Sequence, residues 1–206
     1  VVAKNFGQPE EAFTGLPDED LYIFWAPPPV PLEQARAQIA NPAAPSPQLS
    51  YHISESEWRP CPGGKVATID TSQFPVTTIS AAIVEVEPGA MRELHWHPNA
   101  DEWQYYLAGS ARMTVFDSSS LARTFDYQAG DVGYVPKVLG HYVENTGDDP
   151  MRFLALFRSP LYQDVSLTQW LALTPPDLVK AHLNLSDEVI ASFSKAKQSV
   201  VGGGKA

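Results

Sequence analysis

Three features that often guide the interpretation of a sequence are scarce here: cysteine, positive charge and long apolar runs. The 206 residues include one cysteine, Cys61, which excludes an intrachain disulfide and leaves the redox compartment open. Lysine and arginine together number 14 against 24 for aspartate and glutamate, so the formal net charge is −10. This balance argues against nucleic acid or an anionic membrane surface as a partner. No stretch approaches the ~18 apolar residues of a membrane-spanning helix, so we expect no membrane segment.

The composition changes twice along the chain and predicts three regions. Residues 1–60 are rich in proline, and we expect an irregular arm or connector with a short helix in PLEQARAQIA. Residues 61–160 contain short segments rich in β-branched and aromatic residues, bounded by Gly, Pro, Asp or Asn, which is typical of a sandwich or barrel. Residues 161–206 predict helices followed by a mobile tail, VVGGGKA.

The segment RELHWHPNADEWQYY, residues 92–106, places metal-binding side chains at a regular spacing. Side chains alternate faces along a strand, so His95 and His97 point to the same side. The turn PNAD then leads to Glu102, and an antiparallel neighbour would bring this carboxylate over the histidine pair. His141 begins a later strand after a glycine turn. Three imidazoles and one carboxylate suit a divalent metal, so the sequence predicts a metal site.

The type of metal is less constrained than the site itself. Closed structural zinc sites usually contain thiolates, and Cys61 is far away in the sequence. A carboxylate with imidazoles and open coordination positions suits Mn or Fe better, although ligand type alone does not choose between them. A lone His-x-His pair is more often incidental. Here the following glutamate and the later G-x-x-x-x-x-P-x-x-x-G-H pattern make the metal interpretation specific. His52 and His182 have no such partners, and we expect both to be surface or hydrogen-bonded histidines.

These residues resemble the two sequence motifs of the cupins. The matching positions of the first motif are Gly89, His95, His97, Glu102 and Gly109. Those of the second are Gly130 or Gly133, Pro136, Gly140, His141 and Asn145. Segments such as ARTFDYQAGDVGYVP and DVSLTQWLALTP are similar to the C-terminal cupin of two-domain oxalate decarboxylases, over about residues 2–194. The resemblance implies an all-β double-stranded β-helix (jelly roll), with an extended N-terminal arm, a barrel over residues 61–160 and C-terminal helices.

The resemblance also implies an activity and a set of roles. Mn, or alternatively Fe, would be held by His95, His97, Glu102 and His141, and dioxygen would assist as a co-catalyst. Oxalate, a small dicarboxylate, would be converted to formate and carbon dioxide by a carboxy-lyase. Arg92 would contact the bound oxalate, since a guanidinium pairs with a carboxylate through a fork. Arg92 lies an odd number of residues before His95, so a bend or bulge near Glu93 is needed to turn it inward.

One position departs from the family pattern. Family members commonly carry a glutamate in the strand FLEIF or FLEMF, and this acid/base moves the proton. Here the strand is FLALF, with Ala155 at that position. Asp164, in the loop SPLYQDVS, is a candidate replacement. Its position just before the helix that follows favours a different role, that of an acidic residue that caps this helix. Glu93 and Glu144 are expected on solvated faces of their strands.

Two other functions remain open at this stage. The same ligands without a proton donor would suit an oxalate oxidase-type cupin that forms peroxide, and an intact metal site without an acid also suits a cupin that binds metal or carboxylate without turnover. A homo-oligomer, or a partner cupin domain, is expected because apolar groups on the arm, such as Leu21 to Trp25, would otherwise be exposed. Resemblance to fungal members and the sequon Asn184-Leu185-Ser186 predict a secreted protein.

Overall fold

The structure is a computed structural model that describes residues 31–40, 50–75 and 78–203. The chain divides into two compact units, residues 1–47 and 48–206. In the first unit the described part is helix α2, Leu32–Ala40, which confirms the helix expected in PLEQARAQIA. The apolar residues Leu21 to Trp25, on which the oligomer prediction partly depends, lie outside the described residues.

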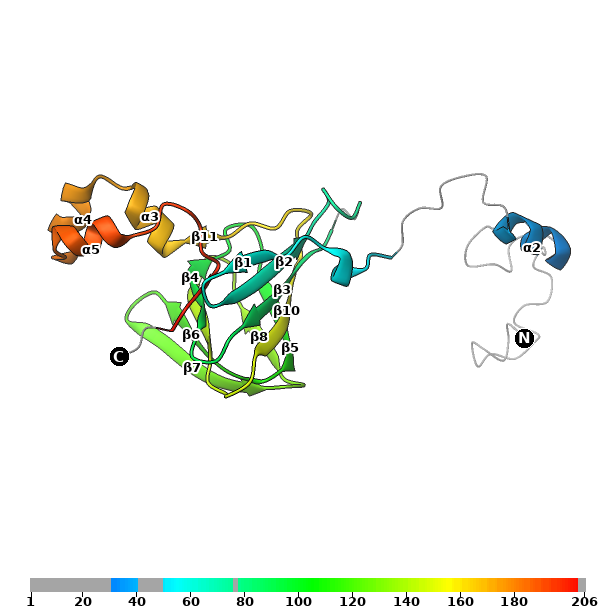
Figure 1. The fold of residues 1–206 in the computed structure, drawn as a ribbon, viewed down its shortest axis with the longest axis horizontal. Helices are drawn as coiled ribbons and strands as arrows, with labels where there is room; N and C mark the ends of the chain where they lie inside the picture. Colours follow the sequence, from blue (N-terminus) through cyan, green and yellow to red (C-terminus); the bar gives the residue numbers. More distant parts are fainter. Residues whose placement is uncertain (1–30, 41–49, 76–77, 204–206) are drawn as a thin grey trace, which may run out of the picture. The chain divides into compact units, whose positions relative to one another are not determined.

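The second unit is built on two antiparallel sheets that face each other (Figure 1). The first sheet has six strands, in the order β1 (Arg59–Cys61), β2 (Gly64–Ile69), β3 (Ser80–Val86), β10 (Met151–Phe157), β5 (Glu102–Ala108) and β8 (Val132–Val135). The second has the order β11 (Val165–Ser166), β4 (Met91–Trp96), β9 (Gly140–Asn145), β6 (Ser110–Asp117) and β7 (Leu121–Gln128), with β12 (Val200–Val201) also paired to β4. A 3-10 turn, η3 (Ile53–Glu55), precedes β1.

The core lies between the inner faces of the two sheets. In β10, Met151, Phe153, Ala155 and Phe157 are buried and alternate with more exposed residues, which is the period of two expected of a strand with one buried face. Residues of the opposite sheet, including Met113 and Val143, complete the same cluster. The all-β jelly roll predicted from the sequence is therefore confirmed.

Strand β4 contains the irregularity that the sequence required. Its pairing with β9 shifts register between Arg92 and His95, which marks a bulge. As a result the consecutive side chains of Arg92 and Glu93 are both buried, and His95 is buried as well. The bulge thus turns Arg92 to the inside, as predicted from its odd spacing to His95.

Three short helices follow the barrel: α3 (Leu167–Leu173), α4 (Pro176–Leu183) and α5 (Asp187–Ser192). Ser166 and Ser186 are the N-caps of α3 and α5, and their hydroxyls accept from backbone N–H groups three residues on. Pro176 lies in the first turn of α4, where its missing N–H costs nothing. Within the described ranges no helix has the length and apolar character needed to span a membrane.

The end of the described chain differs from the mobile tail that we predicted. Val200 and Val201 form β12, and Val200 is fully buried opposite Arg92 of β4. The backbone N–H of Glu93 also donates to the carbonyl oxygen of Ser199 at 3.1 Å. A strand of two residues has no periodicity that a sequence pattern can detect, so this return to the barrel was not predictable.

Candidate metal centre

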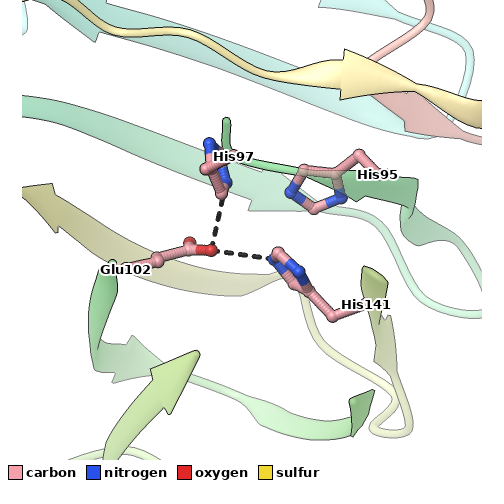
Figure 2. Close-up of side chains that lie close together, drawn as sticks. All are labelled: His95, His97, Glu102 and His141. Carbon is pink, nitrogen blue, oxygen red and sulfur yellow. Dashed lines mark hydrogen bonds and ion pairs between the residues drawn. The ribbon is translucent and has the colours of Figure 1, made fainter. Parts of the chain in front are cut away.

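Four predicted ligands from three parts of the sheet framework come together inside the barrel (Figure 2). β4 carries His95, and His97 follows its last residue. Glu102 begins β5, and His141 lies opposite His95 in the pairing of β4 with β9. All four side chains are buried, and their ligand atoms lie within 4.8 Å of one another. A cluster of this size can be bridged by one metal ion.

The backbone fixes the tautomer of each imidazole. The three Nδ1 atoms contact backbone carbonyl oxygens, at 2.7 Å for His95 to Glu93, 2.8 Å for His97 to Gln163 and 3.0 Å for His141 to Leu139. A carbonyl only accepts, so each Nδ1 carries a proton, and Nε2 is the nitrogen that offers a lone pair in the neutral imidazole. The lone pairs are directed at the centre of the cluster, which is the arrangement that metal-binding histidines require.

Inside the cluster two of the ligand nitrogens have no hydrogen bond from the described protein. Nε2 of His95 and of His97 are buried, and neither has a hydrogen-bond partner among the described residues. Oε2 of Glu102 lies 3.1 Å from Nε2 of His97 and 2.8 Å from Nε2 of His141 (Figure 2). Buried polar atoms are rarely left in this condition, so the cluster fits a cation that these residues would hold.

The electrostatics of the cluster favour the metal-binding forms of its members. Burial, and then the charge of Arg92, lower the pKa of His95 well below its ordinary value, so its imidazole is neutral. Burial alone would raise the pKa of Glu102, but His97 and His141 outweigh it and hold this pKa well below the ordinary range. A neutral imidazole and an ionised carboxylate are the forms that coordinate a metal.

A buried chain of hydrogen bonds orients the carboxylate from behind. Nε2 of Gln104 donates to Oε1 of Glu102 at 3.0 Å, and the hydroxyl of Tyr106 donates to Oε1 of Gln104 at 2.7 Å. Gln104 and Tyr106 are fully buried. This chain leaves Oε2 of Glu102 facing the histidines. Partners of this kind are important for metal affinity because they fix the ligand's direction.

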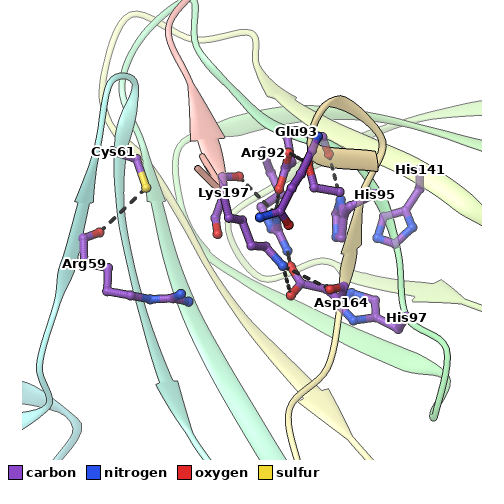
Figure 3. A network of polar contacts seen from close by, with 12 residues as sticks. Arg59, Cys61, Arg92, Glu93, His95, His97, His141, Asp164 and Lys197 are labelled. Carbon is purple, nitrogen blue, oxygen red and sulfur yellow. Dashed lines mark hydrogen bonds and ion pairs between the residues drawn. The ribbon is translucent and has the colours of Figure 1, made fainter. Parts of the chain in front are cut away.

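A second polar cluster surrounds Arg92 beside the histidines (Figure 3). Arg92 is 2 % exposed, and its Nη2 donates to the hydroxyl of Tyr162 at 3.0 Å and to Oδ2 of Asp164 at 2.5 Å. Its Nη1 donates to the carbonyl of Ser199 at 3.0 Å and lies 3.5 Å from Oε1 of Glu93. Although burial would lower the pKa of Arg92, the neighbouring Tyr162 and Asp164 raise it, and the guanidinium is charged.

Asp164 is a partner of two cations. Its carboxylate accepts from Arg92 and from Nζ of Lys197, and its side chain is 5 % exposed. Burial would raise the pKa of Asp164, but Arg92 and Lys197 hold it well below its ordinary range. The N-cap of α3 is Ser166, so the interpretation of Asp164 as the helix cap was wrong. A carboxylate held ionised by two cations is a poor proton donor, and the catalytic role of Asp164 stays a prediction.

The two glutamates predicted on solvated faces behave differently. Glu93 is 2 % exposed, so this prediction was wrong for it, because the bulge in β4 turns its side chain inward. Burial raises the pKa of Glu93, even though the hydroxyl of Ser166 donates to its Oε2 at 2.5 Å. Glu144 is partly exposed on β9 and pairs weakly with Arg112 at 3.9 Å.

Ala155 lies on the same inner face of β10 as Phe157 and contributes no polar group there. Ala155 is buried on the inner face of β10, two residues before Phe157. The ring centroids of Phe157 and His97 are 4.5 Å apart, so this face of β10 packs against the histidine cluster. The glutamate of the family pattern is therefore absent from the face of β10 that packs against the histidine cluster.

Sequence analysis did not identify Gln104, Tyr162 or Lys197 as part of the site. Gln104 shares the inward face of β5 with Glu102, and this spacing of two was available as a signal. Tyr162 is likewise two residues from Asp164 in an extended loop. Lys197 gave no signal, because it follows α5 and reaches Asp164 only through the fold.

Comparisons with known proteins agree with this geometry. The family model described as Cupin matches residues 60–191. The chain is 51 % identical over 202 residues to the oxalate decarboxylase OxdC of Bacillus subtilis, which covers 98 % of this chain and 52 % of OxdC. It is 41 % identical over 206 residues to a probable oxalate decarboxylase of Arthroderma benhamiae, covering 98 % of this chain and 50 % of that protein.

A solved structure gives the same result for the fold. The structure of oxalate decarboxylase from B. subtilis at pH 4.6 matches with a TM-score of 0.75 and 48 % identity, over 98 % of this chain and 53 % of that one. A further B. subtilis oxalate decarboxylase structure, with a TM-score of 0.74, 48 % identity and the same coverage of 98 % and 53 %, is from work on Mn(II) centres. The chain spans about half the length of the relatives it matches.

Proposed function

Since this chain belongs to the cupin family, we propose that it binds manganese and decarboxylates oxalate to formate and carbon dioxide. The observation that carries the proposal is the buried cluster of His95, His97, Glu102 and His141, in which two imidazole nitrogens have no hydrogen-bond partner within the part of the chain that the structure describes. The relatives described as oxalate decarboxylases support the substrate, and the Mn(II) centres of one of them support the metal. Iron is the alternative metal.

When bound, manganese would supply Lewis acidity and one-electron chemistry where the four donor atoms converge, with dioxygen as a co-catalyst. The protein's part is to bind, orient and shield the substrate. Arg92 would pair with a carboxylate of oxalate and stabilise charge that moves during C–C cleavage. The rings of Phe157 and Tyr162 pack against His97 and would exclude water from this side.

Formate production requires a proton at carbon, and the chain has no acid at position 155. This observation favours a second function, an oxidase-type reaction in which oxalate yields carbon dioxide and peroxide. It also suits a cupin that binds metal and carboxylate without turnover. The three functions differ in their products, so they can be separated directly.

The test is an oxalate assay on metal-quantified protein at acidic pH, with and without dioxygen. Formate, peroxide and metal content are measured together. Formate that depends on Mn supports the decarboxylase, and peroxide supports the oxidase-type reaction. Oxalate binding with neither product supports a binding protein.

A pair of variants at position 155 sharpens this test. Ala155→Glu restores a group that can carry a proton, and Ala155→Gln has nearly the same shape without that ability. We expect the formate-to-peroxide ratio to rise in Ala155→Glu and not in Ala155→Gln. Equal ratios in the two variants would contradict the assignment of position 155 to proton transfer.

The helical segment supports a proposal about assembly. Trp170, Leu173 and Leu178 are 57 %, 65 % and 61 % exposed, and Leu183 and Val189 also expose much of their surface. Apolar surface of this kind is typical of an interface. We therefore propose that this surface packs on a second copy or on a partner cupin domain. Light scattering at micromolar concentration tests this, and a monomer there would contradict self-association.

The secreted location remains a proposal that rests on the resemblance to fungal members and on the sequon. Asn184 ends α4 in the left-handed conformation and is exposed, so its side chain can be reached by a modifying enzyme. Expression in a secreting eukaryotic host, followed by glycosidase digestion, tests whether the residue is used. An unchanged mass after digestion would contradict glycosylation.

A further inference from the structure

Arg92, the residue proposed to contact oxalate, is already occupied by protein partners. Its two Nη atoms face four oxygens: those of Ser199 and Glu93 on one side, and of Tyr162 and Asp164 on the other. A fork to a substrate carboxylate uses at least one Nη N–H. Both N–H groups of Nη2 are used by Tyr162 and Asp164, so a fork that includes Nη2 must displace one of these two contacts.

Asp164 is the partner of Arg92 that has a second cation beside it. Removing one member of a buried ion pair is strongly unfavourable, because the remaining charge has no partner. Asp164, however, also has Nζ of Lys197 on its other oxygen, Oδ1. The hydroxyl of Tyr162 donates to Oδ2 at 3.2 Å, the oxygen that Arg92 would leave.

Lys197 is held in place by the backbone on both sides. The carbonyl of Lys195 accepts from Nε2 of Gln169 in α3 at 3.1 Å, and the carbonyl of Ser199 accepts from Arg92. Nζ of Lys197 also donates to the carbonyl oxygen of Asp164 at 3.1 Å. Its side chain is 21 % exposed. This is a fixed lysine with its charge directed at Asp164, and it has no contact with the proposed metal ligands among the described residues.

We propose that Lys197 is a positioning residue for substrate binding, which keeps Asp164 paired when Arg92 leaves it for a carboxylate of oxalate. The inference rests on the proposed function for the identity of the ligand. It assigns Asp164 the role of an exchangeable partner rather than that of a proton donor. It also makes the segment after α5 part of the substrate site, through a side chain that never touches the substrate.

The experiment is a double-mutant cycle on oxalate affinity. Manganese-loaded protein of equal metal content is titrated with oxalate by calorimetry under dinitrogen, for the wild type, Lys197→Met, Asp164→Asn and the double variant. Lys197→Met should bind oxalate about ten-fold more weakly or worse, because Asp164 then has no cation once Arg92 leaves. In the Asp164→Asn background the same lysine change should alter affinity by less than about two-fold, since a neutral amide needs no cation.

The control for the lysine change is Lys180→Met. Nζ of Lys180 pairs with an exposed carboxylate, that of Asp187, at 2.8 Å on the helical segment. It should leave oxalate affinity unchanged. Wild-type affinity in Lys197→Met would overturn the proposal, and so would an equal loss with and without Asp164, which would mean that Lys197 only supports the fold.

A second measurement does not depend on oxalate. The rate at which phenylglyoxal labels Arg92 is followed by peptide mass spectrometry in the metal-free proteins. Asp164→Asn should label fastest and Lys197→Met slowest, because without Lys197 the carboxylate holds Arg92 more tightly. If the metal-loaded wild type binds no oxalate, the proposed function fails. The order of the labelling rates still decides whether Lys197 controls the pairing of Asp164 with Arg92. Equal rates, or faster labelling in Lys197→Met, would overturn it.

Discussion

Two charged clusters lie next to each other inside this barrel, and they are constructed in opposite ways. In the histidine cluster Nε2 of His95 and Nε2 of His97 have no hydrogen-bond partner among the described residues, and a single carboxylate oxygen of Glu102 lies close to Nε2 of both His97 and His141. In the Arg92 cluster Asp164 pairs with both Arg92 and Lys197, and the hydroxyl of Tyr162 accepts from Arg92 and donates to Asp164. Both clusters are buried and both contain carboxylates, so burial and composition do not distinguish them.

The difference lies in what each cluster still lacks. The histidine cluster requires a cation from outside to satisfy its lone pairs. In the Arg92 cluster both N–H groups of Nη2 already have protein partners, so a ligand that takes this end of the guanidinium has to replace one of them. A buried site can thus be prepared for binding either by leaving a position open or by filling it with an exchangeable internal partner.

The largest effect is expected from removing a metal ligand. His141→Ala should weaken Mn affinity more than about 100-fold, since loss of mere supporting contacts already costs ~10–100-fold. Metal retained after dialysis, measured by mass spectrometry, tests this. His182→Ala removes an exposed histidine on α4 and should retain full metal content. Equal retention by the two variants would mean that the cluster is not the metal site.

The next effect concerns the completed cluster. Arg92→Met should lower the free energy of unfolding of the metal-free protein by about 3–5 kcal/mol, because it leaves buried carboxylates with one cation. Arg152→Met breaks the ion pair between Arg152 and Glu85, in which the arginine side chain is 49 % exposed. This change should lower the free energy of unfolding by less than about 1 kcal/mol. Urea denaturation measures both. Similar costs would show that the Arg92 cluster is no more tightly paired than the surface.

Sequence predicted the open cluster far better than the completed one. His95, His97 and Glu102 are close in sequence, and strand alternation is enough to place them on one face. The bulge was predictable because Arg92 could face inward in no other way. Its consequence for Glu93 was missed, since a bulge buries two consecutive side chains. Lys197 could not be predicted, because its partner lies 33 residues away and only the tertiary fold joins them.

Acid should weaken the completed cluster through Asp164. The pKa of this carboxyl in the folded protein lies below its ordinary value of 3.8, owing to Arg92 and Lys197. Ionised Asp164 therefore stabilises the fold when the pH is above the pKa that this carboxyl has in the unfolded chain. This contribution is lost as the pH falls below about 4. The metal-free wild type should lose more stability below this pH than Asp164→Asn, as measured by urea unfolding. Parallel pH profiles would contradict the low pKa.

The smallest expected effect is the difference in unfolding free energy between removing one helix N-cap and removing another. Ser186→Ala removes only the cap of α5 and should cost about 1 kcal/mol. Ser166→Ala removes the cap of α3 and also the donor to buried Glu93, so the cost should be about 2 kcal/mol. The difference, measured by thermal or urea unfolding, reports the hydrogen bond to Glu93. Equal costs would mean that this bond adds nothing.

The pairing of β12 with β4 has a consequence for the order in which the protein is made. Ribosomes synthesise chains from the N-terminus, and parts of a fold can form during synthesis. All four predicted metal ligands have been made once residue 141 is complete, whereas Lys197, Ser199 and β12 come more than 50 residues later. A nascent chain could therefore hold a metal before the guanidinium of Arg92 has its final partners. Metal capture and substrate recognition would then mature at different times, the first within the growing barrel and the second only when β12 has been made.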